Sequence, residues 1–167
     1  MIFIKWITLF GILSISSYIG ILKSKTYENR VIELNRFQNA LVMFRSKIEF
    51  THEPLKNIFE DISNIIYSNN ENIFFNTIQK DSSIYESWSK SIDESKNDLL
   101  QEDKEIIRMM GKLLGKTDIK GQVNEIVLTQ NLIEKQIEKA EKEKNKNMKL
   151  YKTMGVILGL GICIILI

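Results

Sequence analysis

One stretch of the sequence has the residue types of a nucleotide-binding loop. In MGKLLGKTD, Gly115, Lys116 and Thr117 match the last three positions of G-x-x-x-x-G-K-[ST], in which backbone N–H groups and the lysine hold phosphates. The motif also needs a glycine five positions before Gly115, where this chain has Met110. The residues before it have helical periodicity, whereas the loop must follow a strand. We therefore expect a helix that stops at Gly115 in the left-handed conformation and a new helix capped by Thr117 or Asp118.

The other residues with catalytic or metal-binding chemistry stand alone. His52 is the only histidine, so a paired-histidine metal site is excluded, and we expect this residue in an exposed turn before Pro54. Cys163 is the only cysteine, which excludes a disulfide framework and a thiolate metal site. Serine catalysis would need a base that the sequence barely offers. We expect no enzyme activity, no metal and no cofactor.

Adjacent acidic residues recur in the central part of the chain. Neighbouring residues on a helix point in different directions, so these pairs are typical of solvated faces rather than of a shared catalytic proton. Residues 49–118 carry fourteen acidic and eight basic side chains, and this acidic part is a candidate surface for a cytoplasmic partner. The candidate contacts are Glu60, Asp61, Asp93, Glu94, Glu102 and Asp103.

Two uncharged runs lie at the ends of the chain, at residues 6–22 and 153–167. A membrane-spanning helix needs about 20 residues and tolerates about 17, so we expect both runs to span. Ser16 with Gly20, and Gly155 with Gly159, have the four-residue spacing that lets membrane helices approach closely. This spacing fits pairing of the two spans, association of copies of the chain, or ordinary glycine usage in membrane helices.

Basic residues set the expected orientation. Lys23, Lys25 and Arg30 follow the first run and outweigh Lys5 before it, and five lysines precede the second run: Lys142, Lys144, Lys146, Lys149 and Lys152. The positive-inside rule therefore places the central part in the cytoplasm and both termini outside. A cleaved signal peptide is the alternative for the first run, but no A-x-A-like cleavage site follows it. Apart from Lys5 and Lys152, the chain carries 21 basic and 21 acidic residues, and this neutral balance argues against a nucleic-acid partner.

The central part has apolar residues three and four positions apart and one proline, which predicts an all-α fold. Leu34, Phe37 and Leu41 belong to one such apolar stripe. We expect about six helices, at residues 27–50, 55–66, around 73–78, 83–92, around 106–114 and 118–140. The expected domains are an N-terminal transmembrane helix (1–22), a cytoplasmic helical bundle (23–140), a charged helical stalk (141–152) and a C-terminal transmembrane helix (153–167).

Several segments together resemble the stage III sporulation protein AB family. They are FRSKIEF (44–50) with Pro54 and Leu55 after it, LGKTDIKGQVNEI (114–126), the charged stalk, and LYKTMGVILGLGICIILI (150–167). The family usually has a further proline or leucine where this chain reads THEP, a departure that affects only a turn.

This resemblance implies a role in endospore formation, in an assembly of membrane proteins that links mother cell and forespore. It also implies a bundle similar to the platform (F-type) proteins of type II secretion and type IV pilus machines. The implied partner is the ATPase of the same group, stage III sporulation protein AA, on the mother-cell side.

Three functions are therefore compared. The first is a membrane platform whose acidic surface docks a cytoplasmic secretion-type ATPase. The second is a two-span receptor with an extracytoplasmic helical sensor bundle, which would need a signalling output after the second span. The third is a tail-anchored enzyme, which lacks catalytic residues. We favour the platform.

Overall fold

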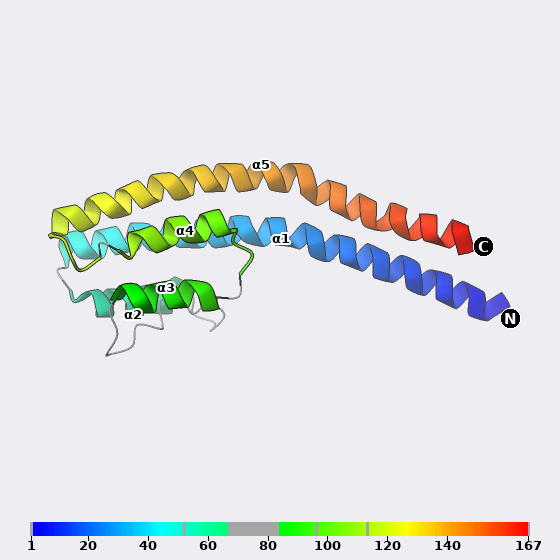
Figure 1. Ribbon diagram of the computed structural model, residues 1–167, viewed down its shortest axis with the longest axis horizontal. Coiled ribbons are helices and arrows are strands. Elements are labelled where there is room, and N and C mark those ends of the chain that lie inside the picture. Colours follow the sequence, from blue (N-terminus) through cyan, green and yellow to red (C-terminus); the bar gives the residue numbers. More distant parts are fainter. Residues whose placement is uncertain (1, 52, 67–83, 96, 113, 167) are drawn as a thin grey trace. The chain divides into compact units, whose positions relative to one another are not determined.

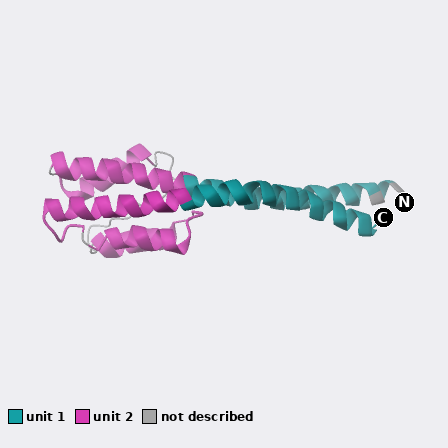
Figure 2. Cartoon of the chain, turned by 90° about the horizontal axis from the view of Figure 1, so that it is seen from above, with its two compact units in different colours: residues 1–31, 139–167 teal, residues 32–138 magenta. Residues whose placement is uncertain are grey.

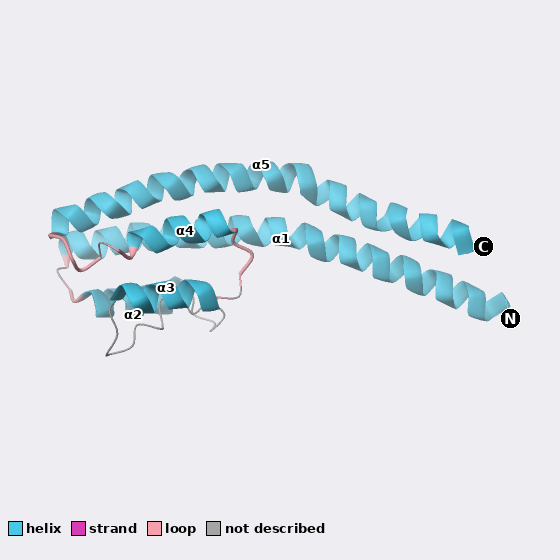
Figure 3. Cartoon of the chain, viewed as in Figure 1, coloured by secondary structure: helices cyan, strands magenta, loops and turns pink. Residues whose placement is uncertain are grey.

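In the computed structural model, the described residues are 2–51, 53–66, 84–95, 97–112 and 114–166, and their regular structure is entirely helical (Figure 3). The helices are α1 (Ile2–Phe50), α2 (Leu55–Ile66), α3 (Ile84–Glu94), α4 (Gln101–Met110) and α5 (Ile119–Leu166) (Figure 1). The predicted all-α class is confirmed for these residues. The helix expected around 73–78, together with His52 and Ser83, lies outside the described residues, so the expected count of six is not tested there.

The two longest helices join segments that the sequence analysis treated separately. The first run and the first bundle helix form α1, which has 49 residues. The last bundle helix, the charged stalk and the second run form α5, which has 48 residues. No proline or glycine occurs between residues 21 and 50 or between 122 and 154, so the helical backbone has no breaker in either segment.

The chain divides into two compact units (Figure 2). Unit 1 contains residues 1–31 and 139–167, and unit 2 contains residues 32–138. This division assigns residues 23–31 and the expected stalk to the unit that holds the apolar ends. The reason is that α1 and α5 continue to contact each other beyond the apolar runs, as described below.

Unit 2 has a core of large apolar side chains. Phe44 and Phe59 meet edge to face with ring centroids 4.7 Å apart, and Trp88 lies 5.6 Å from Phe59 and 6.3 Å from Phe37. The expected stripe of α1 is buried throughout: Leu34, Phe37, Leu41, Phe44 and Ile48. Every other helix also contributes fully buried residues: Ile58, Phe59 and Ile62 from α2, Trp88 and Ile92 from α3, Ile107 and Met110 from α4, and Ile126 and Ile133 from α5.

The turn between α4 and α5 is where the phosphate-loop resemblance was rejected. Gly115 has φ of 75°, the left-handed conformation expected of it. The side chain of Asp118 accepts a hydrogen bond from Gly121 N–H at 2.9 Å, so Asp118 rather than Thr117 caps α5. However, α4 covers Gln101–Met110, earlier than the expected helix around 106–114.

Gly111 at the end of α4 is fixed by contact with the core. Its φ of −64° suits any residue, but a Cβ there would lie 2.2 Å from Cδ1 of Trp88. Trp88 is fully buried, and its Nε1–H donates to the carbonyl oxygen of Ile107 at 2.9 Å. The indole ring is therefore held by packing and by a hydrogen bond, and it has no room to move away from a larger residue.

Replacing Gly111 with alanine is expected to reduce the free energy of unfolding by about 1–3 kcal/mol, because the methyl group overpacks the Trp88 site. Thermal unfolding of the full chain in detergent, followed by near-ultraviolet circular dichroism, measures this. Lys112→Ala, at the next and exposed position, is the matched control and should change stability by less than about 0.5 kcal/mol. Equal losses of stability in Gly111→Ala and Lys112→Ala would contradict the assigned contact between Gly111 and Trp88.

Candidate functional site

Helices α1 and α5 lie side by side and antiparallel throughout unit 1 (Figures 1 and 2). Contacts between them recur along its length. Near the chain ends, the Sγ of Cys163 lies 3.5 Å from the carbonyl oxygen of Leu9. Further along, the rings of Tyr27 and Tyr151 stack with centroids 5.7 Å apart. The two apolar runs therefore form one helical hairpin.

The four small residues singled out in the sequence meet in this hairpin. The hydroxyl of Ser16 donates to the carbonyl oxygen of Gly155 at 2.6 Å. A Cβ on Gly20 would lie 2.6 Å from the carbonyl oxygen of Tyr151 and 3.0 Å from Cα of Gly155. A Cβ on Gly159 would lie 3.0 Å from Leu13. The backbones thus approach so closely that only glycine fits at Gly20 and Gly155.

Two other glycines, Gly11 on α1 and Gly161 on α5, have no close neighbours. A Cβ on Gly11 or on Gly161 would meet nothing within 4 Å. Ordinary glycine usage in membrane helices therefore accounts for Gly11 and Gly161, whereas close packing explains Gly20 and Gly155.

The outer surface of the hairpin is apolar. The helices that contain the two runs have windows with mean hydropathy of 1.5 and 1.7, and only 17% and 11% of those windows is buried. A core helix of a water-soluble protein would bury most of such a window, so this exposure favours a lipid-facing role. By length and composition, both helices can cross a membrane.

Beyond the apolar runs, the hairpin contains an ion pair with one buried partner. Arg30 on α1 is 3% exposed, and its Nη1 lies 2.6 Å from Oε2 of Glu143 on α5. The sequence analysis counted Arg30 only as one of the positive charges that set orientation. Its partner could not be found from the sequence, because the two residues are 113 positions apart and no pattern links them.

The six acidic candidates of unit 2 lie in different surroundings. Asp61 pairs with Lys47 at 2.5 Å, Asp93 with Arg108 at 2.6 Å, and Glu94 with Lys90 at 3.8 Å. Glu60 and Glu102 have exposed side chains. Asp103 is fully buried, and its carboxylate accepts a hydrogen bond from Leu100 N–H at 2.9 Å. Asp103 therefore caps α4 and is not displayed at the surface.

Arg108 joins α4 to α3. It donates to Asp93 and, at 3.1 Å, to the hydroxyl of Ser89 on α3, and it also pairs with Glu105 on its own helix. The hydrogen bond from Arg108 holds the pKa of Glu105 below its ordinary value. In the same way, the hydrogen bond to Asp61 raises the pKa of Lys47. Both acidic candidates with close cationic partners, Asp61 and Asp93, thus also connect helices of unit 2.

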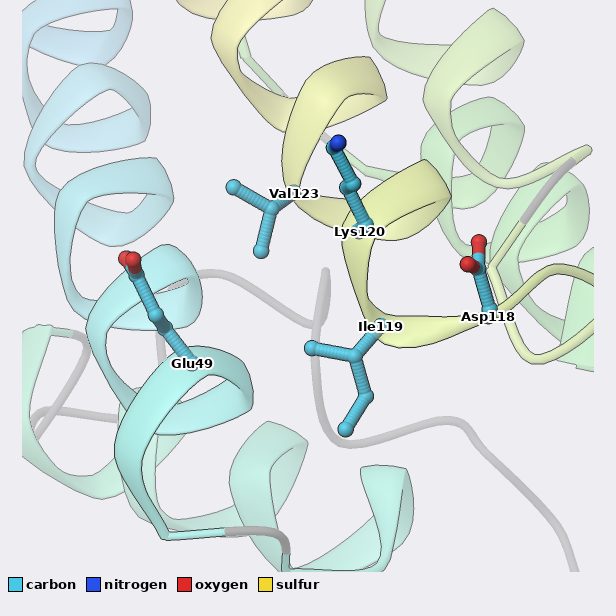
Figure 4. Close-up of a pocket in the computed structure, with 5 residues that line it drawn as sticks. All are labelled: Glu49, Asp118, Ile119, Lys120 and Val123. Atoms are coloured by element: carbon cyan, nitrogen blue, oxygen red, sulfur yellow. The ribbon is translucent and has the colours of Figure 1, made fainter.

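Unit 2 also has an open hollow between the end of α1 and the start of α5 (Figure 4). Its volume is about 640 Å³, and its lining includes Glu49, Asp118, Ile119, Lys120 and Val123. The sequence analysis did not find it, because its two sides are about 70 positions apart. Among the described residues, no group of three or more histidine, cysteine, aspartate or glutamate side chains could hold a metal ion.

The chain was compared with known proteins. The family model described as stage III sporulation protein AB matches residues 5–167. No curated protein and no solved structure matches the chain.

Replacing Gly155 with leucine is expected to reduce the free energy of unfolding of the full chain in detergent by about 1–3 kcal/mol or more, because α1 and α5 must separate. Gly161→Leu, six residues along the same helix, is the matched control and should be nearly neutral, since its Cβ faces open space. Thermal unfolding and denaturant unfolding measure the stability of both variants. A control as damaging as Gly155→Leu would disprove the assigned contact.

Proposed function

The chain belongs to the stage III sporulation protein AB family, and from that premise we propose that it is a two-span membrane platform that docks a cytoplasmic ATPase. Membership gives a role in stage III of sporulation. The single observation that supports an anchored platform is the α1–α5 hairpin, with close glycine contacts inside and apolar side chains outside. Such a hairpin holds both ends of unit 2 at one membrane.

The orientation follows from the distribution of lysines. Lys23 and Lys25 follow the first run, and Lys149 and Lys152 precede the second. By the positive-inside rule, unit 2 lies in the cytoplasm of the mother cell and both termini lie on the other side of the membrane. A receptor with an external sensor bundle would require the opposite orientation.

The acidic surface supports docking of a protein partner. Glu60 and Glu102 are exposed. Asp61, Asp93 and Glu94 form ion pairs with lysine or arginine while their side chains remain accessible to solvent. An excess of acid over residues 49–118 favours a basic partner surface and a faster encounter with it. The partner is stage III sporulation protein AA, the ATPase implied by the family, and the platform itself needs no catalytic residue.

A topology measurement tests the orientation. A cysteine at the exposed position Glu134, in a Cys163→Ala background, should react with a membrane-impermeant maleimide only after the cells are lysed. A cysteine at Phe3, which is 85% exposed near the N-terminus, should react on intact cells. The reverse labelling would support the receptor and overturn the platform.

Charge reversal tests the docking surface. The double variant Glu60→Lys with Glu94→Lys is expected to bind the ATPase at least about tenfold more weakly, because repulsion replaces attraction across the contact. The matched control is Glu134→Lys with Glu138→Lys, which reverses two exposed acids on α5. Binding is measured with the purified ATPase and the full chain in detergent. Unchanged binding by the first variant would show that this acidic surface is not the docking site.

A further inference from the structure

The basic residues of unit 1 are not evenly spread along the hairpin. Next to the apolar runs, residues 23–27 and 146–152 contain five lysines and no acidic residue: Lys23, Lys25, Lys146, Lys149 and Lys152, together called the lysine collar here. Farther out, residues 28–31 and 139–145 contain four bases and three acids. The positive charge is therefore concentrated beside the apolar runs.

The antiparallel pairing brings the two halves of the lysine collar to the same level. Gly20 contacts Gly155 on one side of them, and Arg30 pairs with Glu143 on the other. All five lysines of the collar have exposed side chains. The nearby Arg30 behaves differently, because it is buried against Glu143 and offers no charge to solvent. The side chains of the five lysines are therefore accessible to solvent, whereas the guanidinium of Arg30 is not.

The helical rise sets how far each charge lies from the apolar boundary. At 1.5 Å per residue, the collar lysines lie within about 10 Å of residues 22 and 153. The outer lysines, Lys139, Lys142 and Lys144, lie about 13–21 Å away. Attraction between charges decays over about 8 Å in physiological salt, so charges at the membrane surface attract the collar lysines more strongly than the outer lysines.

We infer that the lysine collar binds the headgroups of anionic phospholipids. Lysine ammonium groups on long, flexible stems can reach the phosphates beside a spanning helix and are attracted to an anionic surface. The inference rests on the two spans of the proposed function, because those spans place the collar at headgroup level.

Lipid selectivity of the full chain in nanodiscs tests this inference. The discs contain phosphatidylcholine with phosphatidylglycerol in both leaflets, so the direction of insertion does not affect the result. Spin-labelled lipids report the relative association of the two headgroups. The wild-type chain is expected to prefer phosphatidylglycerol by about twofold to fivefold, the effect of about one well-placed lysine.

Two variants, each with four lysines replaced by glutamine, distinguish an effect of the lysine collar from an effect of net charge. Lys23, Lys25, Lys149 and Lys152 replaced by glutamine should reduce the preference to about one. Lys135, Lys139, Lys142 and Lys144 replaced by glutamine remove the same charge farther out and should preserve the preference. The four collar lysines replaced by arginine should also preserve it, which shows that any loss comes from charge and not from misfolding.

Further outcomes distinguish the sources of failure. Inorganic phosphate at the same phosphate concentration should not abolish the preference, and its doing so would indicate a free anion site instead of a lipid site. A collar variant that still prefers phosphatidylglycerol, or an outer variant that loses the preference equally, would overturn the inference. Failure of the wild-type chain to remain in the discs would instead contradict the two spans of the proposed function.

Discussion

The close approach of α1 and α5 at Gly20 and Gly155 is the contact on which the architecture of unit 1 depends. Here the missing side chains let one backbone lie against the other, with Cβ positions that would fall within 3.0 Å of backbone atoms. Apolar surfaces gain little from contacting each other instead of lipid, so close van der Waals packing must hold such a pair together. The hydrogen bond from Ser16 to Gly155 adds a polar contact between the two helices.

The charged residues of this protein perform two kinds of work. Some stabilise the fold. Arg30 pairs with Glu143 between α1 and α5, Arg108 pairs with Asp93 between α4 and α3, and Asp103 caps α4. Replacing either partner of the Arg30–Glu143 pair would remove a contact between α1 and α5, which is why these residues belong to the fold. Others, including the lysine collar and the exposed acids of unit 2, are displayed to solvent. Amino-acid composition alone does not distinguish the charged residues that stabilise the fold from those that are exposed to solvent.

The proposed role matches this division between fixed and displayed groups. A platform needs an anchor, a rigid support and a recognition surface, and it needs no catalytic centre. In the proposed role, the hairpin is assigned as the anchor, the aromatic core around Trp88 and Phe59 as the support, and the exposed acids as the recognition surface. Family membership supplies the stage of sporulation in which such a protein acts.

The sequence by itself determined the helical class, the two apolar runs, the stripe from Leu34 to Ile48 and the left-handed Gly115, because each depends on local periodicity or on one residue's backbone preference. It also singled out Ser16, Gly20, Gly155 and Gly159 by spacing, but not which of pairing, association or ordinary usage they serve. Tertiary structure decided that Gly20 faces Gly155 while Gly11 and Gly161 face outward. It also decided that Asp103 and Arg30 are buried. These outcomes depend on partners more than 100 positions away or on packing across helices, and no local pattern encodes either.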